Sequence, residues 1–215
     1  MSPVDEPSTL SAVQPRHGAP AWLADAERLD LAVYEAVANT PTPSLDRALS
    51  RLTRAADHSK LSLAAAGVLA AAGGLRGRRA AARGLTSLAV TAAVVNLGLK
   101  LVARRRRPDV HGVPSVRRVP MPHSRSFPSG HSAAAFAFAT GVGAVLPGAA
   151  IPLRALAVTV AYSRVHTGVH YPGDVIAGAL TGVTLAELTG RAISAYAATR
   201  GGRRSIAPRG WRRAA

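Results

Sequence analysis

The chain has 215 residues, which is room for one domain or for one domain with an appended segment. Its 27 basic and 11 acidic residues give a formal net charge of +16, so we expect an anionic partner, and nucleic acid, acidic lipid and phosphorylated substrates all remain open. Cysteine is absent, which excludes disulfides and thiolate metal sites, and a composition that is 48% hydrophobic but only 4% aromatic predicts an all-α protein with a core of small side chains.

The first part of the chain is polar and then amphipathic. Residues 1–19 are rich in proline, serine and charge and lack an apolar stretch, which predicts a disordered lead-in and no cleavable signal peptide. In residues 20–58 apolar side chains recur every three or four positions, so two amphipathic helices are expected at a membrane interface or against a core. The sequence "NTPTPS" separates them, and Ser44 is expected to cap the second.

Apolar segments dominate residues 59–192. They are residues 61–75, 85–99, 132–153, 155–162 and 175–186. The first two are shorter than the roughly 20 residues that cross a bilayer, so buried helices of a soluble bundle remain an alternative. Pro147 and Pro152 are expected to split the third. Small residues, including Gly178 and Gly182 at GxxxG spacing, favour tight packing of helices within a membrane.

Charge is distributed unevenly around these segments. Arginines bound them and also fill a basic tail, residues 193–215, whereas only three acidic residues follow position 60. This pattern predicts a membrane-embedded bundle of about five or six helices, preceded by the amphipathic helices.

Three polar islands interrupt the apolar half, and the first is "KLVARRRRP". Lys100, Arg104 and Arg107 recur at spacings of four and three, which predicts one cationic helical face. Pro108 disfavours helix at the residue before it, so Arg107 is expected where the helix frays. A basic cluster that merely flanks the membrane explains the same arginines.

The second island is "PSGH", directly before the third apolar segment. Pro128, Ser129 and Gly130 are expected to offer backbone N–H groups, a hydroxyl and the positive end of a helix dipole, which together form an anion site. His131 beside it is placed to protonate an alkoxide that leaves phosphate. An ordinary helix start with a satisfied histidine is the alternative.

The third island is "SRVHTGVHYPGD", which contains Arg164, His166, His170 and Asp174. The two histidines and the aspartate recur every four residues, as metal ligands on one helical face would. The Tyr-Pro-Gly sequence before Asp174 argues against a continuous helix and leaves His170 in a loop. A carboxylate four residues later then holds the Nδ1–H of His170 and leaves Nε2 as a nucleophile.

The order of these three islands resembles the type 2 phosphatidic acid phosphatase family, which is related to vanadium haloperoxidases. The chain shows K-x6-R-P, then P-S-G-H, then S-R-x5-H-x3-D, and the resemblance spans roughly residues 60–190. It implies that His170 attacks phosphorus to form a phosphohistidine, that Asp174 orients it and that His131 protonates the leaving group. By the same likeness, the phosphoryl oxygens are held by Lys100, Arg107, Ser129, Gly130 and Arg164.

The function expected from these patterns is that of an integral membrane lipid phosphatase. Its substrate would be phosphatidic acid, a polyprenyl diphosphate or a polyprenyl-phosphate sugar, with no metal and no cofactor. The alternatives are a vanadate-dependent haloperoxidase and a noncatalytic basic protein that binds a membrane surface or nucleic acid. A nucleic-acid-binding protein would not need His131, His170 and Asp174 beside its arginines, and few aromatic residues are present for stacking on bases, so nucleic acid is not expected as a partner.

The remaining expectations concern topology and the other histidines. Arginine excess at residues 76–83, expected as a loop, and in the tail marks the cytoplasmic side, so we expect a multi-pass protein of the cell membrane with its site on the outer face. His17, His58, His111 and His123 are expected to be solvated, and His166 to shape the loop of the third island.

Overall fold

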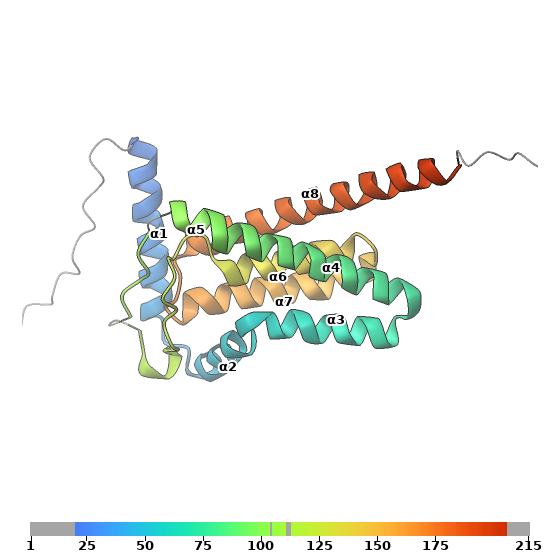
Figure 1. The fold of residues 1–215 in the computed structure, drawn as a ribbon. Helices are drawn as coiled ribbons and strands as arrows, with labels where there is room; N and C mark the ends of the chain where they lie inside the picture. Colours follow the sequence, from blue (N-terminus) through green and yellow to red (C-terminus); the bar gives the residue numbers. More distant parts are fainter. Residues whose placement is uncertain (1–19, 104, 111–112, 206–215) are drawn as a thin grey trace, which may run out of the picture.

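The computed structural model describes residues 20–103, 105–110 and 113–205, and throughout this part of the chain the regular structure is helical (Figure 1). The expected lead-in, His17, His111, Arg104 and residues 206–215 lie outside it. The helices are α1 Ala21–Asn39, α2 Pro43–Ala55, α3 Lys60–Ala72, α4 Gly74–Val94, α5 Lys100–Val102, α6 Gly130–Gly143, α7 Pro147–His166 and α8 Pro172–Ser205. Single turns add η1 Asp57–Ser59, η2 Val95–Leu99 and η3 Ser115–Arg117. The predicted all-α class is confirmed.

The bundle is built around α6, which packs against α4, α7 and α8, while α3 packs against α4 (Figure 1). Small residues set how closely these helices approach. A Cβ on Gly182 would lie 2.2 Å from the Ala133 carbonyl oxygen, and one on Gly178 would lie 2.5 Å from that of Ser129. Only glycine allows α8 to lie this close to α6, which confirms the packing role expected for the GxxxG spacing.

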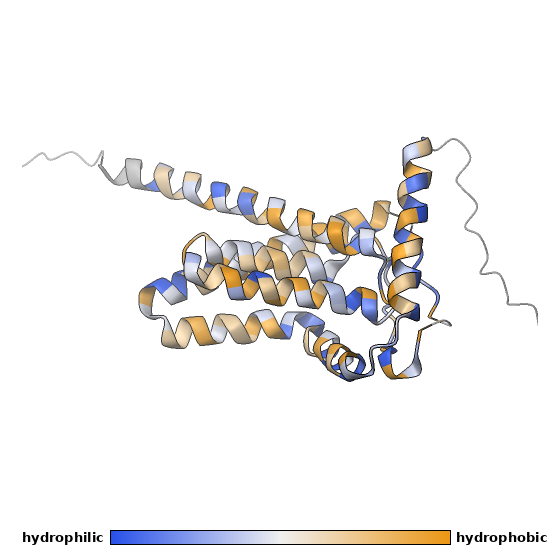
Figure 2. Ribbon diagram, turned by 180° about the vertical axis from the view of Figure 1, so that it is seen from behind, coloured by the Kyte–Doolittle hydropathy of each residue, from blue (hydrophilic) through white to orange (hydrophobic). Residues whose placement is uncertain are grey.

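The outer surface of the bundle is apolar. Leu97, Leu101 and Ile151 are each at least 75% exposed, and Figure 2 shows apolar residues along the lengths of the bundle helices. The continuous helix Gly74–Val102 is long and apolar enough to cross a bilayer, with only 17% of its apolar window buried. A core helix of a soluble protein would be mostly buried, so this exposure favours a lipid-facing helix.

Two local expectations for the bundle are wrong. The arginines of residues 76–83 lie in the first turns of α4 rather than in a loop, because α3 ends at Ala72 and α4 begins at Gly74. Because arginine is a good helix former, a charged stretch between two apolar segments does not have to interrupt the helix. Pro147 does begin α7, but Pro152 lies inside it, as proline can within apolar helices.

The amphipathic helices of residues 20–58 are confirmed as α1 and α2. In Figure 1, α1 lies across one end of the bundle, and it contacts α7 and α8 there, while α2 contacts α7. The residue before α2 is Thr42, and no side chain caps that helix, so the capping role expected for Ser44 is wrong. Pro43 takes the first helical position instead, where its missing N–H costs nothing.

Candidate active site

The three polar islands meet at the end of the bundle that α1 covers (Figure 1). Lys100 comes from α5 and Arg107 from the irregular segment that follows it. His131 lies in the first turn of α6, and Arg164 lies in the last turn of α7. His170 occupies the loop between α7 and α8, as expected from the Tyr-Pro-Gly sequence.

His170 is held by a carboxylate and a hydroxyl. Its Nδ1 lies 3.4 Å from Asp174 Oδ2 and 3.4 Å from the Ser126 hydroxyl, which also donates to Asp174 Oδ2. The Tyr171 backbone N–H donates to the same carboxylate oxygen at 3.0 Å. Ser126, His170 and Asp174 are all buried, so the imidazole is fixed in orientation with Nε2 on its other side.

Arg107 lies on that other side. Its Nη1 is 3.1 Å from His170 Nε2 and donates to the Val169 carbonyl at 2.9 Å. Burial lowers the pKa of His170 from 6.5 to about 4; the hydrogen bond to Asp174 opposes this shift and the nearby Arg107 charge adds to it. A histidine with this pKa is neutral at pH 7 and therefore has a lone pair for nucleophilic attack.

The cationic helical face predicted for the first island is not formed. The helix ends at Val102, and Ala103 is already extended, so Lys100 and Arg107 are brought together by the fold of the following segment. The link is the Ser124 hydroxyl, which accepts from Lys100 Nζ at 3.3 Å and from Arg107 Nη2 at 3.1 Å. The chain has thus left the helix well before Pro108, whose steric restriction acts only on Arg107.

His131 has its own carboxylate partner, Asp57 of η1. The Asp57 Oδ1 atom lies 3.1 Å from His131 Nε2 and 3.6 Å from Arg164 Nη1. Arg164 is 2% exposed and donates from Nη1 to the Thr53 hydroxyl of α2 at 2.7 Å. Residues at the end of α2 and in η1 therefore complete the site formed by α6 and α7.

Ser129 and Gly130 lie at the start of α6 but play different parts. The Ser129 hydroxyl is buried against Ser132, and its backbone N–H donates to the Asp174 carbonyl at 2.9 Å. Ser129 thus caps α6 and joins it to α8. Gly130 faces Lys100, whose Nζ would lie 3.4 Å from a Cβ at that position.

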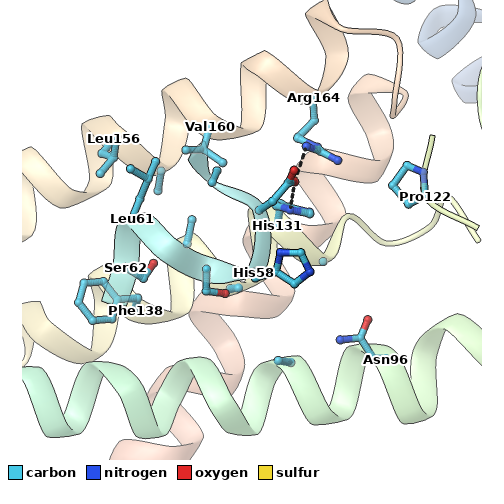
Figure 3. A pocket seen from close by; sticks show the side chains of 18 of the residues that line it. His58, Leu61, Ser62, Asn96, Pro122, His131, Phe138, Leu156, Val160 and Arg164 are labelled. Atoms are coloured by element: carbon cyan, nitrogen blue, oxygen red, sulfur yellow. Dashed lines mark hydrogen bonds and ion pairs between the residues drawn. The ribbon is translucent and has the colours of Figure 1, made fainter. Parts of the chain in front are cut away.

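A cavity of about 430 Å³ extends from these residues between α3, α4, α6 and α7. Its polar end is formed by Asp57, Lys100, Gly130, His131 and Arg164. Farther along, the walls are apolar and come from residues such as Leu61, Ala135, Phe138, Leu156 and Val160. Figure 3 shows His131 and Arg164 at one end of this lining and Phe138 and Leu156 toward the other.

Several contributors to the site, Ser124 and Thr53 among them, were missed by sequence reasoning. Ser126 bonds Asp174, and Asp57 bonds His131, as described above. Arg105 bridges Asp174 and Asp30, whose Oδ1 also accepts from the Gly173 backbone N–H at 2.6 Å. In the sequence, Arg105 is one of four consecutive arginines, and nothing marks it out from the others. Likewise, Asp30 and Asp57 look like any polar residue on the exposed face of an amphipathic helix.

Two other histidines lie near the site. His58 is exposed, as expected, and it also lines the cavity. His166 is fully buried against Asp46 of α2. Because α7 ends at His166, the helical face that would carry it together with His170 and Asp174 is not formed. Within the described residues, no group of three or more histidine, aspartate or glutamate side chains could hold a metal ion.

Comparison with known proteins agrees with this arrangement. A decaprenylphosphoryl-5-phosphoribose phosphatase of Mycolicibacterium smegmatis is 37% identical over 164 residues, which cover 73% of this chain and 84% of that protein. The protein of the same name from Mycobacterium tuberculosis is 38% identical over 94 residues, and the match spans only about half of its length, 49%. Aquifex aeolicus LpxE has a similar fold, with a TM-score of 0.62 over 76% of this chain and 95% of that one, at 24% identity.

The family model of the PAP2 superfamily matches residues 80–196, a stretch that contains all three islands. This match covers more than half of the 215 residues, and it agrees with the identity to the Mycolicibacterium smegmatis protein. The chain therefore belongs to the PAP2 superfamily.

Proposed function

We propose that this protein is a membrane lipid phosphatase that works through a phosphohistidine intermediate. The observation that carries the proposal is the cavity, which is cationic at one end and apolar along the rest of its walls. A phosphate group fits Lys100 and Arg164 at the polar end, and an aliphatic chain fits the walls formed by Phe138 and Leu156. An amphiphile with a phosphorylated head has both parts.

In the first step, His170 Nε2 attacks phosphorus as the bond between phosphorus and the lipid oxygen breaks. The departing oxygen takes a proton from His131, so the products are the lipid alcohol and a phosphohistidine. Lys100, Arg107 and Arg164 stabilise the charge that spreads over the phosphoryl oxygens. Arg107 is 3.1 Å from Nε2, close enough for its N–H groups to turn to those oxygens when phosphorus approaches.

In the second step, water attacks the phosphohistidine. His131, now neutral, takes the proton from that water, and the nitrogen–phosphorus bond breaks to release inorganic phosphate. Asp174 holds Nδ1 throughout, which keeps Nε2 as the reacting nitrogen and stabilises the ring while it carries positive charge. Both steps use side chains of this chain alone.

The substrate we propose first is a polyprenyl-linked sugar phosphate, because two of the relatives above are named for decaprenylphosphoryl-5-phosphoribose. A polyprenyl diphosphate and phosphatidic acid satisfy the same site chemistry. The apolar walls do not select one chain by hydrogen bonding, so discrimination among these lipids has to be measured.

The test is phosphate release by the purified protein in detergent from a panel of these lipids. We expect release from at least one of them, and essentially none from His170→Ala, which lacks the nucleophile. His123→Ala is the matched control, because that histidine is exposed and outside the site. Retention of more than a few per cent of activity by His170→Ala would reject the phosphohistidine, and silence of the wild-type protein on every lipid phosphate would reject the function.

A further inference from the structure

Each histidine of the candidate site is paired with a carboxylate, although only one of these pairs lies within a sequence motif. Asp174 follows His170 by four residues, whereas Asp57 precedes His131 by 74 positions. Asp57 lies before residue 80, outside the stretch matched by the family model. In Figure 3, dashed lines mark the contacts of this carboxylate with His131 and with Arg164.

The backbone around Asp57 is built to hold it there. His58 and Ser59 have φ angles of 55° and 59°, so two successive residues with side chains adopt the left-handed conformation. This conformation is unfavourable for residues with a side chain and persists where the surrounding structure enforces it. The two residues turn the chain sharply from α2 into α3, and η1 packs on α6 at this turn.

The preceding helix fixes the same position from the other side. α2 packs on α7, and its Thr53 accepts a hydrogen bond from Arg164 at 2.7 Å. Thr53 and Asp57 are four residues apart and both reach Arg164, so the end of α2 is held against the end of α7. The packing of η1 on α6 and of α2 on α7 together hold the Asp57 carboxylate next to His131.

We propose that Asp57 is a positioning residue for acid catalysis by His131, an inference that rests on the phosphatase reaction proposed above. An imidazolium has two N–H groups, and the one on Nε2 is held by Asp57 at 3.1 Å. The carboxylate fixes the ring and stabilises its positive charge until the other N–H gives its proton to the departing lipid oxygen. The ring then becomes neutral and ready to take a proton from water.

A role through Arg164 is the competing explanation, and the two roles predict different kinetics. Arg164 holds phosphoryl oxygens in every substrate, so loss of its support weakens hydrolysis of all phosphate esters alike. Protonation of the leaving group matters only when that group is a poor one, such as the alkoxide of a lipid alcohol. An aryl phosphate such as 4-nitrophenyl phosphate releases a stable phenolate without an acid.

The experiment compares Asp57→Asn with the wild-type protein on a lipid phosphate and on 4-nitrophenyl phosphate. The neutral amide keeps the size of the side chain but removes its charge. General acid catalysis contributes about 10²–10⁴-fold to the rate, and Asp57 supports only part of it. We therefore expect kcat on the lipid phosphate to fall by about 10-fold or more. The rate on the aryl phosphate should fall by a much smaller factor, which also reports that the variant is folded, and Asp57→Glu should restore part of the lipid activity.

Two further variants make the test decisive. Asp25→Asn is the matched control, because that carboxylate is exposed on α1 and pairs only with Arg28 in the described structure. Adding Asp57→Asn to His131→Ala should cause no further loss on the lipid phosphate, since the carboxylate acts through that ring. Equal losses on both substrates, or additive losses in the double variant, overturn the proposal. A wild-type protein inactive on both substrates overturns the phosphatase function itself.

Discussion

At the scale of single residues, the environment of His170 determines its protonation. The side chain is 1% exposed, and burial lowers its pKa from 6.5 to about 4 despite the hydrogen bond to Asp174. Burial and the nearby charge of Arg107 both disfavour the protonated, charged imidazole, so both lower its pKa. Between pH 6.5 and pH 4 the folded protein therefore keeps this imidazole neutral, where an exposed histidine would take up a proton.

This protonation state can be measured directly. In the protein with ¹⁵N-labelled histidine in detergent, the imidazole signal that is missing from His170→Ala should be that of a ring that is neutral at pH 5. The exposed His123, which lies outside the site, provides a reference signal in the same spectrum. A His170 signal that titrates near pH 6.5 would contradict the buried, neutral nucleophile.

The charged groups of the site also predict its response to metals and to vanadate. In the proposed mechanism, Lys100, Arg107 and Arg164 supply the fixed cations for a transferring phosphoryl group, the role that Mg²⁺ has in many phosphatases. The nearby carboxylates do not form a cage, because Asp57 pairs with His131 and Asp174 with His170. We expect activity on a lipid phosphate to survive excess EDTA.

Vanadate should inhibit the same reaction, because it becomes five-coordinate and imitates the trigonal-bipyramidal transition state with His170 as an axial ligand. Both assays use phosphate release in detergent, with His170→Ala as the background. Activity that EDTA abolishes and Mg²⁺ restores, together with indifference to vanadate, would reject this mechanism.

At the scale of elements, the sequence predicted helices better than their ends. Periodicity located α1 and α2, and the apolar segments located the bundle, because burial follows hydrophobic pattern. The arginines of residues 76–83 did not end a helix, since a charged residue at the end of a bundle helix reaches solvent without leaving the helix. Proline was informative at position 147, the start of α7, and misleading at position 152.

The site was predictable where its residues are local in sequence and not where they meet through tertiary packing. The pairing of His170 with Asp174 spans four residues, and a motif can record it. The contact of Asp57 with His131 spans 74 residues, and that of Asp30 with Gly173 spans 143. Such contacts depend on how α1 and α2 pack on the bundle. The amphipathic pattern of a helix indicates which of its faces is buried, but not which element that face packs against.

Arg117 of η3 is the residue that joins these two helices to each other. It is 1% exposed, and its Nε donates to Asp46 of α2 at 2.8 Å. Its Nη atoms donate to the carbonyls of Val37, Ala38 and Thr40 at the end of α1. It therefore satisfies backbone groups that the end of a helix leaves without partners.

Arg117→Ala should destabilise the protein strongly, because it leaves a buried carboxylate without its main cation. Breaking such a buried pair costs about 3–5 kcal/mol, so we expect a clearly lower thermal unfolding midpoint in detergent. Arg51→Ala is the matched control, since Arg51 is an exposed residue of α2. An unfolding midpoint for Arg117→Ala equal to that of the control would contradict this role.

At the scale of the whole molecule, the N-terminal helices contribute residues to the candidate site. The family model begins at residue 80, after α1, α2 and α3. Even so, Asp30 of α1 holds Arg105 against Asp174, and η1 brings Asp57 to His131. The end of the bundle that carries the site is thus covered by α1, which lies across it (Figure 1).

This polarity gives a prediction for the orientation of the protein in the membrane. At the end opposite the site, Arg76, Arg78 and Arg79 are exposed, and α8 extends past the bundle with exposed Arg191 and Arg200 (Figure 1). At the site end, several arginines are neutralised within the protein, as Arg105 and Arg117 are by carboxylates. Arg106, Arg118 and Arg125 are exposed at the site end, so the expectation of an outward site rests on the arginine excess in α4 and α8, which marks the cytoplasmic side.

The absence of cysteine makes this orientation simple to test with single-cysteine variants. Ser115→Cys places an exposed thiol at the site end, and Leu75→Cys places one at the α3–α4 connection, where the leucine is 60% exposed. In intact cells, an impermeant maleimide should label Cys at position 115 and spare the one at position 75, whereas permeabilised cells should show both. Because five bundle helices lie between residues 60 and 205, an outward site also places α1 outside and the end of α8 inside. Labelling of position 75 alone in intact cells would reverse the orientation and place lipid phosphate hydrolysis on the cytoplasmic face.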